Sequence, residues 1–181
     1  MTASIKGVRC LEEGRGFRSW LFQDWAVNQN RPDSQLILLG FRFGQWARWH
    51  WGVFGKKIVE PAWWMFGWIL GIEIPLKVEI GERLRLYHPN GILLNPESRI
   101  GADCHLRHGV IVGNRLDRNG KESKIPRIGN NVELGASCAI LGDVEVGSHA
   151  KIGALAVVVK NVPDSAVVVG NPGRVVRIDA T

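Results

Sequence analysis

The chain has 181 residues, of which 45% are hydrophobic and 22% charged, and its formal net charge is +6. This length suits one compact domain with an appendage, and it can bury a core without disulfide bonds. The three cysteines lack the spacing of a disulfide framework or a zinc knuckle, and the first residues lack a signal-peptide core. The longest apolar run, residues 62–70, is too short to cross a bilayer. We therefore expect a cytoplasmic protein with no nucleic-acid partner, since its net charge fits simple solubility.

Residues 1–71 are predicted to form a helical segment rich in tryptophan. All eight tryptophans and all six phenylalanines precede residue 69, and such large rings fill the irregular spaces between helices. Helical spacing predicts a short helix and then a longer amphipathic one, which has Arg42, Gln45 and Arg48 on its polar face. Pro61 suits the first turn of a third helix. The apolar stripes of the first two helices are Phe17, Trp20, Leu21 and Trp25, and then Leu36, Leu39, Phe43 and Trp46.

From residue 72 the sequence changes to aliphatic positions that recur every six residues. This period is neither the 3.6 or so of an α-helix nor the roughly two of a plain strand. It fits a short strand followed by a tight corner, with the aliphatic residue inside a triangular coil of about 18 residues. We therefore predict a mainly β protein with a parallel β-helix over residues 72–162. The repeat residues are Ile74, Ile80 and Leu86, then, after a two-residue slip, Leu94, Ile100, Leu106 and Val112, and then Ile128, Leu134, Ile140, Val146, Ile152 and Val158.

Two features interrupt the repeat. The gap between Val112 and Ile128 is ten residues longer than one period. The polar residues 114–126 are therefore predicted to form a loop that protrudes from one corner and shapes a site. Further on, Asn171-Pro172-Gly173 predicts a turn, so residues 163–181 are expected to fold back as a cap on the last coil.

Four sequence motifs resemble those of the hexapeptide-repeat acyltransferases, and within them the serine acetyltransferase branch. They are YHPNGILL (87–94), IGADCHLRHGVIVGN (100–114), PRIGNNVELGASCAILGDVEVGSHAKIGA (126–154) and VVVKNVPDSAVVVGNPGRVV (157–176). Within that branch the chain resembles the short acetyltransferases of exopolysaccharide biosynthesis, such as those for colanic acid. The resemblance implies a left-handed parallel β-helix with a short N-terminal helical segment.

The resemblance also implies a homotrimer with active sites between neighbouring β-helices and acetyl-CoA as co-substrate. His88 stands at the position of the family's catalytic histidine, which takes a proton from the acceptor hydroxyl during attack on the thioester. An imidazole suits this role because it titrates near neutral pH. Glu73, fifteen residues earlier, matches the acidic residue that orients this histidine, although the family has aspartate there. A solvated glutamate is the alternative for Glu73.

His108 lies 20 residues after His88, which equals one coil plus the slip. This spacing predicts that the two histidines stack on one edge, with their backbones about 5 Å apart. His108 then either shares acceptor binding and proton transfer with His88 or packs in the trimer interface. His50, His105 and His149 have no comparable support.

Three positions match the family's contacts with the coenzyme, namely Asn114, Ala136 and Ala154. Small side chains suit these contacts, because the pantetheine arm must approach the main chain closely. Lys160 and Arg174 are candidates to bind the phosphates of acetyl-CoA, because both are basic and lie near the C-terminal coils.

The acceptor is where the sequence departs from serine acetyltransferases. Tyr87 and Lys124-Ile125 stand where those enzymes have an acidic residue and an Arg-His pair, and the segment 1–71 replaces a larger helical domain. We therefore expect a sugar hydroxyl as acceptor, in exopolysaccharide or other cell-surface glycan biosynthesis. The basic, aromatic N-terminal segment predicts peripheral contact with the inner face of a membrane, where lipid-linked glycans are made.

Three alternatives stay open. The chain could instead be a serine acetyltransferase, or a β-helix scaffold without catalysis. It could also use the same fold for zinc chemistry, as γ-class carbonic anhydrases do, with His88, His105 and His108 as the ligands. Against zinc, the spacing of three between His105 and His108 turns their side chains to different faces, so we predict no metal site.

Overall fold

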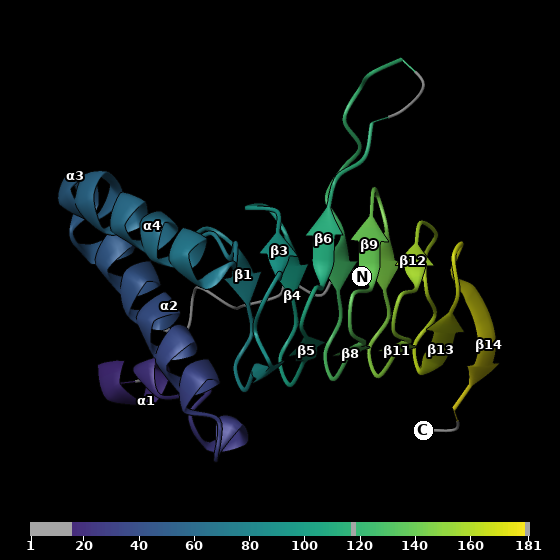
Figure 1. The fold of residues 1–181 in the computed structure, drawn as a ribbon, viewed down its shortest axis with the longest axis horizontal. Coiled ribbons are helices and arrows are strands. Elements are labelled where there is room, and N and C mark those ends of the chain that lie inside the picture. The colour runs from purple at the N-terminus through teal and green to yellow at the C-terminus, as the bar shows by residue number, and fades with distance from the viewer. Residues whose placement is uncertain (1–15, 117–118, 180–181) are drawn as a thin grey trace.

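A computed structural model describes residues 16–116 and 119–179. Helices pack against one end of a long solenoid of β-coils, and the chain runs away from them coil by coil (Figure 1). Residues 1–15, which include Cys10, lie outside the described residues. The expectation that the chain has no signal peptide concerns these residues.

The helical end has two main helices, each starting beside a proline. Pro32 is at the first position of α2, and Pro61 lies in the first turn of α4, where a missing N–H costs nothing. Gly71 ends α4 in the left-handed conformation, with a φ of 65°. Among the residues that the structure describes, no helix combines the length and apolar character needed to cross a bilayer. The helical elements are α1 (Phe17–Leu21), η2 (Ala26–Asn28), α2 (Pro32–His50), α3 (Gly52–Phe54), η3 (Gly55–Val59) and α4 (Glu60–Leu70).

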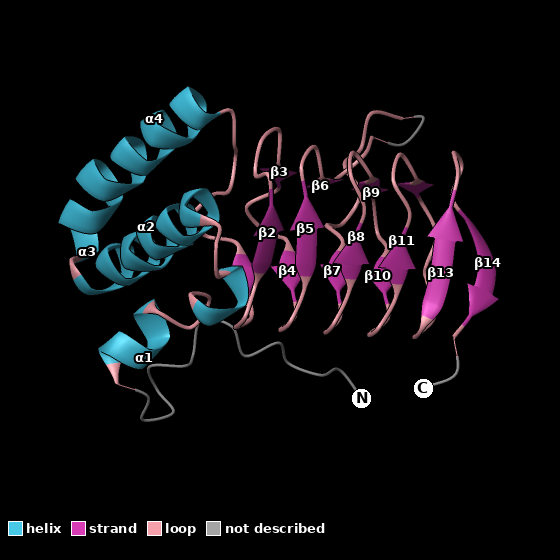
Figure 2. Cartoon of the chain, turned by 60° about the horizontal axis from the view of Figure 1, so that its bottom comes forward, coloured by secondary structure: helices cyan, strands magenta, loops and turns pink. Residues whose placement is uncertain are grey.

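The solenoid has three faces, each a stack of short strands from successive coils (Figure 2). Strand pairs are parallel except β13 with β14, which is antiparallel and covers the last coil. The predicted fold, a left-handed parallel β-helix preceded by helices, is confirmed. Sheet 1 holds β1 (Glu79–Ile80), β4 (Arg99–Ile100), β7 (Arg127–Ile128) and β10 (Glu145–Val146); sheet 2 holds β2 (Arg85–Tyr87), β5 (His105–Arg107), β8 (Glu133–Leu134), β11 (Lys151–Ile152), β13 (Ala166–Val169) and β14 (Arg174–Ile178); sheet 3 holds β3 (Leu93–Leu94), β6 (Ile111–Gly113), β9 (Ala139–Leu141) and β12 (Val157–Val158).

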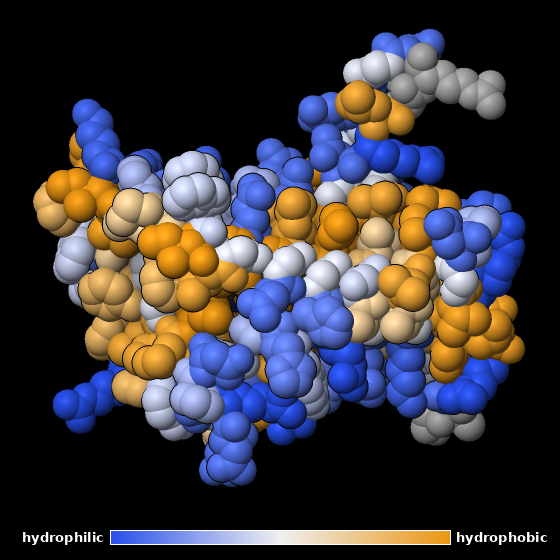
Figure 3. All heavy atoms as spheres, in the orientation of Figure 1, coloured by the Kyte–Doolittle hydropathy of each residue, from blue (hydrophilic) through white to orange (hydrophobic). Residues whose placement is uncertain are grey.

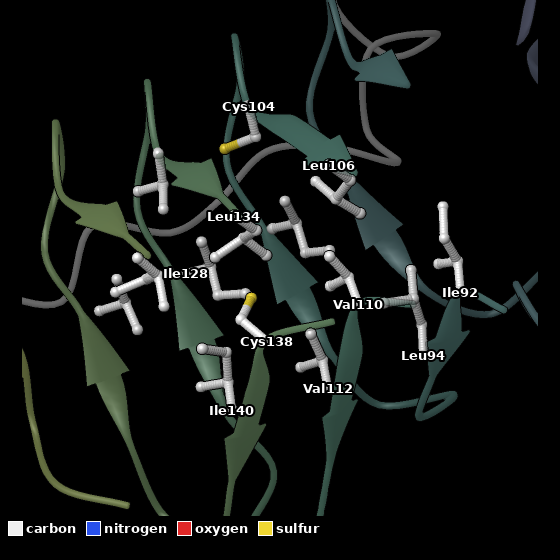
Figure 4. Close-up of a cluster of buried hydrophobic side chains, with 14 of the residues drawn as sticks. Ile92, Leu94, Cys104, Leu106, Val110, Val112, Ile128, Leu134, Cys138 and Ile140 are labelled. Carbon is white, nitrogen blue, oxygen red and sulfur yellow. The ribbon is translucent and has the colours of Figure 1, made fainter. Parts of the chain in front are cut away.

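The repeat residues fill the interior of the coils. Leu86, Leu106 and Leu134 pair across successive coils and are 0–1% exposed. Figure 4 shows Leu106 and Leu134 inside the coils among other aliphatic side chains, together with Cys104 and Cys138. Burial raises the pKa of the Cys104 thiol to about 11 and that of Cys138 to about 12, as expected for an apolar interior.

The described parts of the predicted loop, residues 114–116 and 119–126, lie between β6 and β7 and project away from the solenoid (Figure 1). Their base is tied by a bridge between Leu116 and Glu122 and by a bond from the Ser123 amide to the Arg115 carbonyl. The coils before and after this loop stay in register, because Ile100 pairs with Ile128.

The predicted apolar face of α2 is wrong. Leu36 is 62% exposed, whereas Arg42 and Gln45, which were placed on the polar face, are 0% and 7% exposed. The buried apolar residues of this helix are Ile37, Leu38, Phe41 and Ala47. The reason is that α2 packs on the open end of the first coil, and such an end needs polar partners as well as apolar cover.

Arg42 is the centre of those polar contacts. Its guanidinium donates to the carbonyls of Ile80 (2.9 Å) and Gly81 (2.7 Å) and to the Asp24 carboxylate (2.8 Å). Asp24 in turn accepts from the Leu84 amide (2.8 Å). The arrangement satisfies strand groups that would otherwise be buried without partners.

Side chains of three further residues continue the cap along the same coil. The Asn28 amide group bonds both the Leu84 carbonyl and the Leu86 amide, and Ser34 Oγ donates to the Leu86 carbonyl. Gln45 donates to the carbonyl of Val78 (2.9 Å). The helices therefore act as a polar end-cap for the β-helix.

We predict that Arg42→Met lowers the free energy of unfolding by about 3–5 kcal/mol, because Asp24 and two strand carbonyls lose their buried partner. Arg48→Met is the control, since Arg48 lies on the same helix but makes a partly exposed ion pair with Glu60. Its cost should stay below about 1 kcal/mol. Urea unfolding followed by circular dichroism measures both, and equal costs would contradict the end-cap.

Candidate functional site

His88 lies on the edge where sheet 2 turns into sheet 3. Tyr87 pairs with Arg107, but the Gly109 amide bonds the carbonyl of Asn90 (2.8 Å), so the two-residue slip inserts His88 and Pro89 at this corner. The insertion takes His88 out of the regular stack. Its side chain is exposed, and its backbone is left-handed, with a φ of 53°.

The predicted direct stacking of His88 on His108 is wrong in detail. The backbone pairing stacks Asn90 on His108 instead, because the slip falls between Tyr87 and Asn90. Both histidines still lie on the same edge, and both are exposed.

Two of the predicted coenzyme positions continue this edge toward the C-terminus. The Ser137 amide bonds the His108 carbonyl (2.8 Å), and the Leu155 amide bonds the Ala136 carbonyl (2.9 Å). Asn90, His108, Ala136 and Ala154 therefore form one column, one residue per coil, with a rise of about 4.8 Å per coil. We call this column the histidine edge.

The histidine edge offers hydrogen-bond donors that the fold does not use. Within the described part of the chain, the amides of Ala136 and Ala154 have no hydrogen-bond acceptor, and neither residue is buried. Beside them runs a groove of about 450 Å³ on the outer face of sheet 2. Its lining includes Tyr87, His105, Arg107, Ala136, Lys151 and Ala154. The groove therefore extends from Tyr87, the residue before His88, to Ala136 and Ala154.

The remaining coenzyme candidates are divided between two edges. Arg174 opens β14 and pairs with Val169, at the end of sheet 2 nearest the histidine edge. Asn114 follows β6 and Lys160 follows β12, so both lie on the opposite edge of sheet 3, which we call the loop edge. One solenoid therefore does not bring all five coenzyme candidates together.

Glu73 lies on the first coil, where it pairs with Leu93. Its side chain is exposed at an apolar cavity of about 340 Å³ between α4 and the coil, beside Trp63, Trp64 and Trp68. Among the described residues no hydrogen bond or ion pair joins Glu73 to His88. The orienting role of Glu73 stays a prediction.

A cluster of arginines around Tyr87 was not predicted. The centres of the Arg31, Arg107 and Arg85 guanidiniums lie 4.2, 4.7 and 5.8 Å from the centroid of the Tyr87 ring. His105 meets the same ring edge-on at 6.0 Å. The six-residue repeat could have indicated part of this cluster. The residues on either side of the inward Leu86 and Leu106 must point outward from the same face of the coil.

The pKa of His105 is lowered, chiefly because the ring is partly buried. The carboxylate of Glu133 opposes this shift, while the charges of Arg85 and Arg107 add to it. His105 faces this positive surface and does not join His108 in a ligand set. Nowhere in the ranges 16–116 and 119–179 do three histidine, cysteine or acidic side chains lie close enough to hold a metal ion.

Comparison with known proteins agrees with the repeat. A family model described as "Bacterial transferase hexapeptide (six repeats)" matches residues 125–160. The chain is 35% identical over 130 residues to a serine acetyltransferase of Mycobacterium tuberculosis, covering 72% of this chain and 56% of that protein. It is 42% identical over 105 residues to the putative colanic acid biosynthesis acetyltransferase WcaB of Escherichia coli, covering 58% and 63%. The chain thus spans less than two thirds of the length of these curated relatives.

Solved structures of serine acetyltransferases share the fold. The enzyme of Neisseria gonorrhoeae superimposes with a TM-score of 0.77 at 24% identity, over 96% of this chain and 72% of that one. The Brucella abortus enzyme in complex with coenzyme A gives a TM-score of 0.77 at 24% identity, over 94% and 71%.

Proposed function

Because the chain belongs to the hexapeptide-repeat acetyltransferases of the serine acetyltransferase family, we propose that it transfers an acetyl group from acetyl-CoA to a sugar hydroxyl. The product belongs to the biosynthesis of exopolysaccharide or another cell-surface glycan. One observation carries the proposal: the exposed His88 lies on the same edge as two small residues with unused amides, Ala136 and Ala154.

His88 acts as the general base in this proposal. Its imidazole takes the proton of the acceptor hydroxyl as the oxygen attacks the thioester carbonyl, so that a C–O bond forms and the C–S bond breaks. The departing sulfur takes up a proton and leaves as the thiol of CoA. Acetyl-CoA itself supplies the activated carbonyl. Glu73 orients the His88 ring, and His108, on the next coil, contributes to acceptor binding.

The residues along the histidine edge fit a pantetheine arm. That arm carries amide carbonyls, and the amides of Ala136 and Ala154 are free donors on adjacent coils. Their methyl side chains let the arm reach the main chain. The solved complex of the Brucella abortus relative with coenzyme A supports the choice of coenzyme. We assign the phosphate groups of the coenzyme to Arg174, which pairs with Val169 at the C-terminal end of the same edge.

The surroundings of Tyr87 favour a sugar over serine as acceptor. An amino acid is a zwitterion, and the three guanidiniums around Tyr87 attract its carboxylate but repel its ammonium group. The similarity to WcaB supports the same choice. Serine O-acetylation is the second candidate, favoured by the Mycobacterium tuberculosis relative. Release of CoA thiol from acetyl-CoA with L-serine, compared with sugar acceptors, separates the two.

We propose that the working form is a homotrimer. Asn114 and Lys160 lie on the loop edge, while His88, Ala136 and Ala154 lie on the histidine edge. The strands of sheet 3 separate these edges within one copy. A neighbouring copy could bring its loop edge against the histidine edge and complete the coenzyme site.

We also propose that the helical end touches a membrane surface. Trp64, Trp68 and Ile69 on α4 are 66%, 75% and 68% exposed, and hydrophobic side chains gather over this end of the molecule (Figure 3). Lys56 and Lys57 lie in η3, which leads directly into α4, and are also exposed. Exposed tryptophans beside lysines suit the interface of a bilayer that contains anionic lipids.

We predict that His88→Asn lowers kcat by about 10²–10⁴-fold, because the general base is lost. His149→Asn is the matched control, since both histidines are exposed and left-handed, with φ values of 53° and 62°, and asparagine tolerates that backbone. The control should keep wild-type activity. Thiol release from acetyl-CoA measures both variants, and a fully active His88→Asn would show that another group is the base.

We predict that light scattering gives a mass three times that of the 20.1 kDa chain. If two copies share each coenzyme site, Lys160→Glu should raise the KM for acetyl-CoA. Co-expression of His88→Asn chains with Lys160→Glu chains should restore transfer, because some interfaces then pair an intact histidine edge with an intact loop edge. A monomeric mass, or mixed chains no better than either variant alone, would contradict the shared site.

We predict that the full chain floats with vesicles of phosphatidylcholine and phosphatidylglycerol, and that flotation weakens at high salt. Replacing Trp64 and Trp68 together by serine should abolish flotation. Leu116→Ser is the control, because Leu116 is similarly exposed, at 63%, but lies on the protruding loop. A wild-type chain that stays at the bottom of the gradient would end the membrane proposal.

A further inference from the structure

The ring of Tyr87 lies among positive charges from two separate parts of the fold. Arg85 and Arg107 come from neighbouring strands of sheet 2, while Arg31 precedes α2. Their guanidinium centres lie between 4.2 and 5.8 Å from the ring centroid. Such stacking holds the guanidinium planes in place and leaves the N–H groups of Arg31 and Arg107 free to bind a ligand.

Acidic side chains do not neutralise this cluster. Within the described residues, neither Arg31 nor Arg107 has a carboxylate in ion-pair range, and Arg85 donates to the Val27 carbonyl and to the Tyr87 hydroxyl. The acidic groups nearby are Asp33 in the first turn of α2, Glu133 across from His105, and Asp103, which is paired with Arg83. The cluster therefore keeps a net positive charge.

The N-terminus of α2 adds to this potential. Ser34 donates to the Leu86 carbonyl, so the first turn of this 19-residue helix lies against the strand that carries Tyr87. No side chain caps that N-terminus. The partial positive charge of the helix end thus adds to the three guanidiniums.

We infer that Arg31, Arg85 and Arg107 form an anion subsite that binds the phosphate or diphosphate group of a phosphorylated sugar acceptor. The inference rests on the proposed function and names its substrate class. Three guanidiniums from two parts of the fold can surround the several oxygens of a phosphate or diphosphate, whereas a single arginine is enough for the two oxygens of a carboxylate. A nucleotide sugar and a lipid-linked sugar diphosphate share this chemistry.

The position of the subsite matches the proposed chemistry. Tyr87 immediately precedes His88, which the slip places outside the stack at the same corner. An anion held at Tyr87 would set the attached sugar beside the His88 imidazole. The coenzyme positions Ala136 and Ala154 lie one and two coils beyond His108, and Arg174, the basic candidate for the CoA phosphates, lies beyond them at the other end of sheet 2. The subsite thus belongs to the acceptor and not to the phosphates of CoA.

Binding of inorganic pyrophosphate, measured by calorimetry on the full chain, tests the subsite without any catalysis. Arg31→Gln and Arg107→Gln should each weaken binding about tenfold or more, because each removes charge-assisted hydrogen bonds. Arg31→Lys and Arg107→Lys should recover part of it. Arg99→Gln is the control, since Arg99 lies on sheet 1 and pairs with Glu79. Unchanged pyrophosphate binding in both glutamine variants would overturn the subsite.

Acceptor kinetics test the substrate class. UDP-glucose and a polyprenyl diphosphate-linked sugar in vesicles are compared with free glucose. The glutamine variants should raise the KM of the phosphorylated acceptor about tenfold or more and leave kcat and the KM of acetyl-CoA nearly unchanged. If only one phosphorylated acceptor is used, it identifies the source of the anion.

Pyrophosphate binding and acceptor kinetics together distinguish a failure of the anion subsite from a failure of the proposed function. Arginine-dependent pyrophosphate binding without acetyl transfer to any acceptor would sink the proposed function and keep the anion subsite. Transfer to free and phosphorylated sugars with equal KM values, unaffected by Arg31→Gln, would sink the substrate class and keep the acetyltransferase. A changed KM for acetyl-CoA alone would assign the arginines to the coenzyme.

Discussion

The unpaired backbone at the open end of the first coil is the constraint on which the rest of the molecule depends. A β-helix satisfies its strands by stacking, so its first coil has no neighbour on one side. Arg42, Asp24 and Asn28 supply the missing partners by direct bonds to strand carbonyls and amides. These bonds fix where the helices lie, and they reach the strand that ends at Tyr87. The end-cap therefore also sets the position of Arg31, which precedes α2 and lies over that ring.

The candidate site forms where the repeat fails. A perfect hexapeptide repeat would place every corner residue in the stack, with its backbone held by the coils on either side. The slip after Tyr87 inserts His88 and Pro89, which displaces His88 from the column. The longer insertion in the sequence, residues 114–126, likewise interrupts the repeat at the loop edge. Both departures can be seen in the sequence, because a strict period makes any change of spacing visible.

This contrast explains what could be predicted from the sequence and what could not. The predicted inward residues of the repeat are buried in every coil. They could be predicted because burial of an aliphatic residue in each strand allows only one register. The face of α2 was wrong, because spacing alone ranks Leu36 above Arg42 as a core residue, and only the coil beneath the helix reverses that order. Arg31 could not be assigned to the site for the same reason. The repeat sets no rule for how a helix lies across its end.

The two halves of the site also differ in how freely they can change. Gly135 lies next to Ala136, and a Cβ there would come within 2.6 Å of the Ala154 amide nitrogen. A substitution at Gly135, beside the histidine edge, would thus disturb the stacking of the coils. The proposed acceptor side comprises Arg31, Tyr87 and the inserted His88, which lie outside the regular interior. Coil stacking therefore constrains the proposed coenzyme side of the site, whereas residues of the proposed acceptor side at the capped end can change without disturbing the coils.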